Sequence, residues 1–219
     1  MTEIAHFVKK EFQLDWRNRT LIGSILLYVI SSIYVTHLAF QNAIDLPTWN
    51  SLFWIITLFT AFNASSKSFS QEERKFLYLY MLISPQKLLI SKMLYNILLM
   101  LIIGSLSLFG FYLFISNEFL STDNFWLYYL SVSLGAIGLA VILTMISAIA
   151  SKTGNQTGMM AILGFPVIIP FLLATIKFSG ETLIGKGLHL SGSYLLMMSA
   201  IIVMVGLLSY LLFPYIWRE

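Results

Sequence analysis

Cysteine is absent from the 219-residue chain. The sequence therefore offers no thiol for a disulfide, a thiolate metal site, an iron–sulfur cluster or covalent haem attachment. Charged residues are also scarce, at 11%, whereas hydrophobic residues make up 58%. A soluble domain normally has about twice that charged fraction, so this balance predicts a membrane protein.

Six stretches contain no Asp, Glu, Lys or Arg. They are residues 20–44, 46–66, 93–117, 124–151, 153–176 and 187–217. Each is long enough to cross a hydrocarbon core of about 30 Å, which needs about 20 helical residues. Their apolar runs are continuous, whereas the strands of a membrane barrel alternate polar and apolar residues. We therefore predict an all-α membrane protein with six transmembrane helices in one domain.

The formal charge of +3 could suggest a nucleic-acid partner, but the positions of the basic residues have a better explanation. If the N-terminus is cytoplasmic, the inner segments hold Lys9, Lys10, Arg17, Arg19, Lys67, Arg74, Lys75, Lys87, Lys92, Lys152 and Arg218. The outer loops then hold only Lys177 and Lys186. Basic residues concentrate on the cytoplasmic side of membrane proteins, which predicts that both ends lie inside. No nucleic-acid partner is expected.

Residues 2–19 are predicted to form an amphipathic elbow helix ahead of the first span. Its apolar residues recur at helical spacing: Ile4, Phe7, Val8, Phe12 and Trp16. The basic residues lie on the other side, which suits anionic lipid or a partner protein. The simpler alternative, an anchor that only marks topology, stays open.

Residues 67–92 form the longest hydrophilic stretch and are predicted to be a cytoplasmic coupling region. Ser70 and Glu73 have the spacing of a capping box, which predicts a helix that Pro85 stops after Ser84. The apolar stripe of this helix consists of Phe76, Leu79, Tyr80 and Ile83. Such a helix either lies on the bilayer or docks into a groove of another protein, and the residues alone do not separate these alternatives.

Two later spans carry unusual residues. The fourth, at 124–151, has Gly135, Gly138 and Ala140 among small residues that permit close helix approach, either within the chain or at a dimer seam. The fifth, at 153–176, has Pro166 and Pro170, which remove two backbone donors and should kink or break the helix. Broken helices often line pathways, but a kink that serves packing is equally common.

No catalytic group is predicted. The segment from Gly180 to Lys186 has the spacing of a phosphate-binding loop, but Gly187 follows where Ser or Thr is needed, and the predicted topology places it outside. The spans lack the charged residues of most ion-coupled carriers. His37 and His189 fall on the same predicted face as candidate haem ligands, or they are interfacial histidines without a chemical role. Energy for transport would therefore come from another subunit.

An elbow helix, two spans, a capped cytosolic helix and four more spans occur in an order that resembles type-2 ABC exporters. More specifically, the chain resembles the CcmB family, the haem exporter permeases of cytochrome c maturation. The residues that carry the resemblance are 69–85 with Lys92, Gly135-Ala-Ile-Gly138, the double-proline segment 163–170, and the basic stretch 9–19.

This resemblance implies the permease of an ABC transporter for c-type cytochrome biogenesis at the bacterial inner membrane. It implies a separate CcmA-like ATP-binding subunit that holds the ATP, a CcmC-like haem-handling protein, and two copies of each transporter subunit. No cofactor is predicted to be resident, and haem would be a substrate. Residues 70–85 would couple the spans to the ATPase. A generic type-2 exporter of a drug, lipid or glycan, and an assembly scaffold that transports nothing, are the alternatives.

Overall fold

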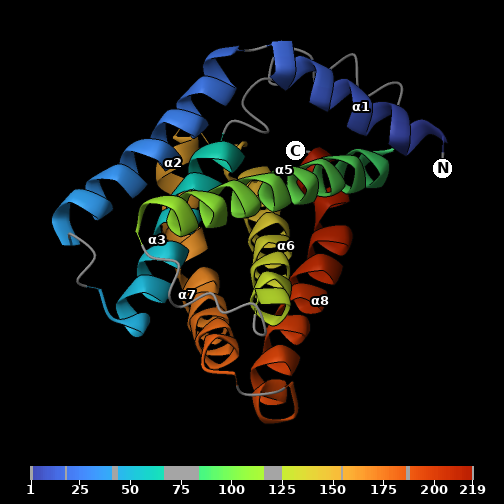
Figure 1. Ribbon diagram of the computed structural model, residues 1–219. Helices are drawn as coiled ribbons and strands as arrows, with labels where there is room; N and C mark the ends of the chain where they lie inside the picture. The colour runs from blue at the N-terminus through green and yellow to red at the C-terminus, as the bar shows by residue number, and fades with distance from the viewer. Residues whose placement is uncertain are drawn as a thin grey trace.

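The computed structural model describes residues 2–17, 19–40, 44–66, 84–115, 125–153, 155–185 and 188–218, with side chains described at 6–13, 23–40, 44–66, 84–115, 125–153, 155–185 and 192–215. These residues form seven helices. They are α1 (Thr2–Arg17), α2 (Arg19–Phe40), α3 (Leu46–Ser66), α5 (Pro85–Phe114), α6 (Phe125–Ala150), α7 (Gln156–Leu183) and α8 (Leu188–Arg218). The prediction of an all-helical chain is confirmed (Figure 1).

Five of these helices contain segments long and apolar enough to cross a membrane. The segments are Gly23–Phe40, Pro85–Phe114, Phe125–Ala150, Gln156–Leu183 and Gly192–Tyr215. The remaining predicted span, at 46–66, forms α3, which has 21 residues but also contains Asn50, Asn63 and several hydroxyl side chains. The structure therefore supports five spans by length and composition. Helix α3 has the same bounds as the remaining predicted span, 46–66.

The helix ends follow local sequence. Pro85 begins α5, where the missing N–H of proline costs nothing because the first helical N–H groups have no partner within the helix. The side chain of Asn155 accepts a hydrogen bond from the Gly158 N–H and caps α7. Beyond the other end of α7, Gly185 has φ 79°, a conformation that glycine adopts without strain.

Asp45 precedes the first residue of α3. Its carbonyl oxygen accepts from the Trp49 N–H at 2.9 Å. A hydrogen bond from Thr48 to the carboxylate lowers the pKa of Asp45, since that bond favours the charged form. Helix α3 starts at Leu46, so Pro47 lies in its first turn, where the missing N–H of proline needs no partner within the helix.

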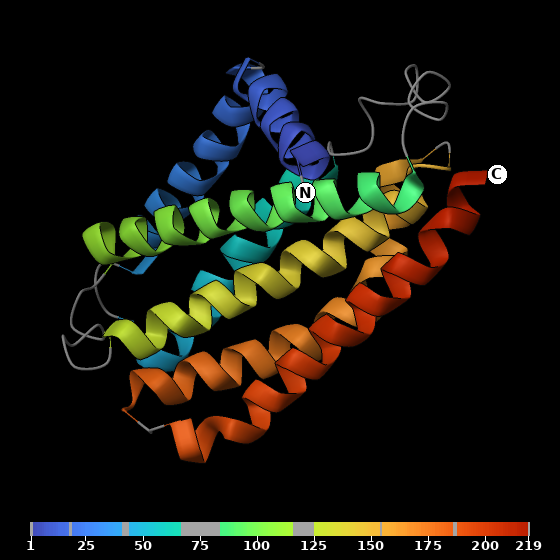
Figure 2. The same ribbon diagram turned by 90° about the vertical axis from the view of Figure 1, so that its right-hand side faces the viewer.

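Helix α6 lies at the centre of the bundle, where it contacts α3, α5, α7 and α8 (Figure 2). It is the most enclosed of the candidate spans, with 72% of an 18-residue apolar stretch buried. Helices α2 and α8 lie at the periphery, with 11% and 17% of their span residues buried. Helix α1 leaves the bundle axis and packs against α5 and α2 (Figures 1 and 2).

The outer surface of the helices is rich in large apolar side chains. Examples are Leu27 on α2, Ile102 on α5, Leu173 on α7 and Leu211 on α8, which are all more than half exposed. A soluble protein rarely exposes such extensive apolar surface, whereas lipid solvates it at no cost. This surface accounts for the high hydrophobic content of the chain.

Two helices extend beyond the predicted spans. Helix α5 begins at Pro85 instead of 93, so Lys87 and Lys92 lie within a helix rather than in a connecting segment. Helix α7 continues past 176 through Lys177 and Glu181. Both differences have one cause: the predicted spans stop at each charged residue, whereas backbone hydrogen bonding continues wherever a charge has a partner or reaches solvent.

Candidate functional site

A buried polar cluster joins α3, α6 and α7 near the first turns of α3. The Asn50 side-chain amide donates to the Ile176 carbonyl oxygen at 2.9 Å, and its own oxygen accepts from the Ser179 hydroxyl at 2.9 Å. Trp54 Nε1 donates to the same Ser179 oxygen at 2.8 Å, and the Tyr128 hydroxyl lies 3.5 Å from the Asn50 oxygen. We call these four side chains, Asn50, Trp54, Tyr128 and Ser179, the Asn50 cluster.

Aromatic rings surround the Asn50 cluster. Phe53 stands edge-on to Trp54 and Phe111, with ring centroids 5.2 and 5.4 Å apart. Trp49 packs edge-on against Phe111 at 5.4 Å. These rings are fully buried, so the polar groups of the cluster are shielded from lipid and water. An unpaired polar group is costly in such surroundings, which makes the cluster a specific contact between α3 and α7.

The small residues of α6 lie against these aromatic side chains. A Cβ at Gly135 would stand 2.2 Å from a Trp54 ring carbon, and one at Gly138 would stand 2.0 Å from a Phe171 ring carbon. Ala140 is fully buried. Within the bundle, Gly135 and Gly138 therefore make room for rings of α3 and α7, which lets the helix backbones approach closely.

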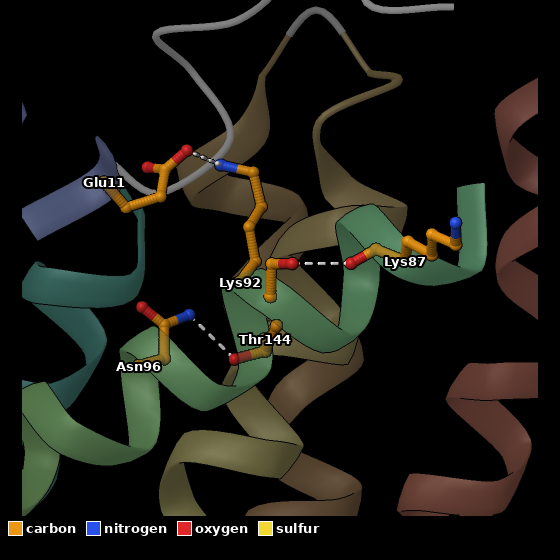
Figure 3. A network of polar contacts seen from close by, with 6 residues as sticks. Glu11, Lys87, Lys92, Asn96 and Thr144 are labelled. Atoms are coloured by element: carbon orange, nitrogen blue, oxygen red, sulfur yellow. Dashed lines mark hydrogen bonds and ion pairs between the residues drawn. The ribbon is translucent and has the colours of Figure 1, made fainter. Parts of the chain in front are cut away.

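A second polar site lies where α3 and α6 end and α5 and α7 begin; we call this the Pro85 end of the bundle. Lys92 of α5 reaches toward Glu11 of α1, with Nζ 3.8 Å from Oε1 (Figure 3). The Lys92 side chain is 1% exposed and that of Glu11 is 13% exposed. A charged side chain enclosed to this degree at a span is expensive unless it is paired, and such residues commonly mark a functional contact.

The same face of α5 continues this site toward α6. One turn beyond Lys92, the Asn96 amide donates to the Thr144 hydroxyl at 2.8 Å (Figure 3). Thr144 in turn donates to the carbonyl oxygen of Ala140 at 2.6 Å. Glu11, Lys92, Asn96 and Thr144 thus connect α1, α5 and α6, and we call them the Lys92 network.

Further contacts at the Pro85 end connect the remaining inner helices. The Ser147 hydroxyl of α6 donates to the Ser65 carbonyl oxygen of α3 at 2.9 Å. Gln156, the first residue of α7, donates to the Ser147 oxygen at 3.3 Å. The polar side chains named at this end are amides, hydroxyls and an ion pair, each of which joins two helices. These contacts hold α1, α3, α5, α6 and α7 together at the Pro85 end.

Most of the predicted coupling helix lies outside the described residues. This applies to Ser70, Glu73, Phe76, Leu79, Tyr80 and Ile83. Ser84 is exposed and extended at the start of α5, and Pro85 is the first residue of that helix. The predicted coupling segment therefore connects directly to the helix that carries Lys92.

The two prolines of α7 lie within one uninterrupted helix from Gln156 to Leu183, so of the predicted kink or break, the break does not occur. Pro166 is exposed and Pro170 is half-buried. Beside them, a wholly apolar pocket of about 130 Å³ opens between α3 and α7. It is lined by Leu58, Phe59, Phe62, Ala161, Phe165 and Ile168. A helix continues through proline where neighbouring groups satisfy the freed carbonyls, as membrane helices often do.

The two candidate haem ligands are not brought together by described contacts. His37 is half-buried on α2, where its ring stands edge-on to Phe114 of α5 at 6.4 Å. His189 belongs to α8, and its side chain lies outside those described. Within the described residues, α2 packs against α1, α3 and α5, and there is no group of three or more His, Asp or Glu side chains able to hold a metal ion.

The sequence patterns did not identify the Asn50 cluster or the Glu11–Lys92 pair. Lys92 was assigned to a connecting segment because it is charged, yet it stands among the apolar residues Leu88, Leu89 and Tyr95 of one helical stripe. A lone lysine inside an apolar stripe is a signal of a buried partner. Glu11 likewise shares a face of α1 with Phe7 and Val8.

The fold defines a class of protein: a multi-pass helical membrane protein whose helices are joined by buried polar contacts. The family model described as CcmB protein matches residues 2–215, so the chain belongs to the CcmB family. No curated protein and no solved structure matches the chain. Family membership implies a permease role in a cytochrome c maturation ABC transporter, whose ATPase is a separate subunit.

Proposed function

We propose that this chain is the transmembrane subunit of a bacterial inner-membrane ABC transporter that serves c-type cytochrome biogenesis. The single observation that carries the proposal is the match to the CcmB family over residues 2–215. In this proposal residues 1–219 form one domain with six spans, both ends are cytoplasmic, and α1 is the elbow helix. Two copies work with two CcmA-like ATP-binding subunits and a CcmC-like haem-handling protein.

The transported species has two candidates within this role. Either haem passes through the permease, or ATP turnover releases a haem-loaded chaperone from the neighbouring haem-handling protein. In the described part of the chain, His37 is half-buried on α2 and His189 belongs to α8. We propose haem as cargo of the complex rather than as a resident cofactor of this chain.

Haem staining of c-type cytochromes tests the proposed function. Cells that lack this chain are expected to lose mature c-type cytochrome while total haem stays normal, and a plasmid copy is expected to restore it. Normal cytochrome in the deletion strain would contradict the proposal and would favour a generic type-2 exporter. Loss of cytochrome together with an ATPase rate that is the same with and without this chain would instead favour an assembly scaffold.

We further propose that residues 70–85 couple the permease to its ATP-binding subunit. The support is their place in the sequence, between the end of α3 at Ser66 and the start of α5 at Pro85, because α5 carries Lys92. Ser70 and Glu73 cap the proposed helix. Phe76, Leu79, Tyr80 and Ile83 form its docking stripe, and Ser84 and Pro85 join it to α5.

Replacing Glu73 and Phe76 together by alanine is expected to weaken association with the ATP-binding subunit about tenfold or more, since a cap and a central aromatic anchor are both lost. The measurement is copurification of the ATP-binding subunit, with membrane insertion checked by fractionation. Tyr78→Ala is the matched control, because it removes an aromatic ring from the opposite side of the predicted helix. Equal copurification for the double variant and wild type would refute the coupling role.

A further inference from the structure

Helix α1 is held to the bundle by a buried ion pair between Glu11 and Lys92. A helix that served only as a membrane anchor would not need such a contact. Glu11 and Lys92 lie 3.8 Å apart and are almost wholly enclosed. The outward side of α1 carries Lys9, Lys10 and Phe12, which are exposed. The Glu11 side chain instead turns inward, toward Lys92 of α5 (Figure 3).

The position of Lys92 connects this contact to the proposed coupling segment. Lys92 stands two turns beyond Pro85, where α5 begins. Any displacement of the segment before Pro85 is passed along α5, because a helix is stiff over two turns. Asn96, one turn further, bonds Thr144 of α6, so the same face of α5 contacts α1 and α6 in succession. A displacement of the start of α5 would therefore act on α1 through Lys92 and on α6 through Asn96.

The Glu11–Lys92 ion pair opposes separation of α1 from α5 because both side chains are enclosed. Separating Glu11 from Lys92 would leave an enclosed ammonium without its carboxylate, which costs far more than breaking an exposed ion pair. Helices α1 and α5 also share an extended packing surface. Separating α1 from α5 therefore costs more free energy than moving the two helices as one unit.

We propose that the Glu11–Lys92 ion pair clasps α1 to α5, so that α1 moves with the start of α5 when the ATP-binding subunit acts on the permease. Glu11 and Lys92 are positioning residues: they bind no cargo and transmit displacement. The inference rests on the proposed function, because it requires an ATP-binding subunit to drive the motion. It gives the elbow helix a mechanical role in the transport cycle.

Distance measurements between spin labels test the clasp directly. Since the chain has no cysteine, a Gln13→Cys and Leu94→Cys pair places labels on exposed positions of α1 and α5 without background labelling. The complex with its ATP-binding subunit is reconstituted with labelled chain diluted by unlabelled chain, then measured without nucleotide and with ATP and vanadate. The expected wild-type result is a narrow distance distribution that is the same in both states.

The decisive variant is Glu11→Gln with Lys92→Met, which removes both charges together, so that neither stays enclosed without the other. It is expected to insert and to bind the ATP-binding subunit normally. Its label distances are expected to broaden with ATP and vanadate, and its cytochrome yield is expected to fall about tenfold, as for mutations along a coupling network. Lys152→Gln, which removes an exposed lysine outside the network, is expected to change neither readout.

Exchange of the two charges, Glu11→Lys with Lys92→Glu, is expected to recover narrow distances and to bring cytochrome within about twofold of wild type. Wild-type distances and cytochrome in the neutral double variant would overturn the clasp and leave the pair a purely structural contact. This result is distinct from failure of the proposed function, in which deleting the whole chain leaves cytochrome normal.

Discussion

Replacing Gly138 by valine is expected to destabilise the folded chain by about 3 kcal/mol, the upper part of the usual range for overpacking. A side chain at this position meets Phe171, whose ring carbons lie 2.0, 2.5 and 2.9 Å from the Cβ position. Phe171 is fully buried, and close-packed cores accommodate added methyl groups only at the cost of strained side chains or shifted backbone. The measurement is the apparent melting temperature of the detergent-purified chain, followed by size-exclusion chromatography after heating.

Two variants establish that the loss comes from this contact. Gly23→Val on α2 makes the same substitution where nothing lies within 4 Å of the added Cβ, so its melting temperature is expected to stay near wild type. Combining Gly138→Val with Phe171→Ala removes the opposing ring and is expected to recover part of the loss. Equal melting temperatures for Gly138→Val and Gly23→Val would show that α6 and α7 do not pack as described.

Replacing Trp54 by alanine is expected to cost about 3 to 5 kcal/mol, because the substitution leaves a large cavity in an enclosed core. Trp54 is fully buried, covers Gly135, and donates its indole N–H to Ser179 at 2.8 Å. The same melting measurement applies. Trp126→Ala is the matched control, since that indole is 74% exposed and its removal is expected to cost little folding stability.

Trp54→Phe separates packing from hydrogen bonding. It keeps an aromatic ring over Gly135 but removes the donor to Ser179, and a hydrogen bond between membrane helices contributes about 0.6 kcal/mol on average. The phenylalanine variant is therefore expected to lie much closer to wild type than the alanine variant. If the phenylalanine variant were as unstable as the alanine variant, the hydrogen bond to Ser179, and not the packing of the ring on Gly135, would be the main contribution of Trp54.

The helices themselves were largely predictable, because a bilayer imposes the same requirement on every span. The stretch 46–66 coincides with α3, and 124–151 differs from α6 by one residue at each end. The errors fall where a charge lies inside a helix. Two charge-free stretches end at Lys92 and Lys177, but the helices continue through both residues. Lys92 is buried and paired with Glu11, whereas Lys177 is exposed.

The candidate site was less predictable, because its residues are far apart along the chain. Asn50 and Ser179 each look like an ordinary polar residue in a span, and only their mutual hydrogen bond gives them a common role. Gly135 and Gly138 were identified as small residues at a contact, but not the rings that they accommodate. The coupling helix at 71–84 remains a prediction from its capping box and apolar stripe.

Hydropathy, charge placement and a handful of motifs were enough to identify a helical membrane protein and its resemblance to one permease family. These properties are local: they depend on how each segment meets lipid or water, and neighbouring residues determine that. The partners of Glu11, Asn50 and Gly138 were decided only by tertiary structure. A buried contact depends on which helices lie side by side and how each is rotated, and the packing of the whole bundle sets both.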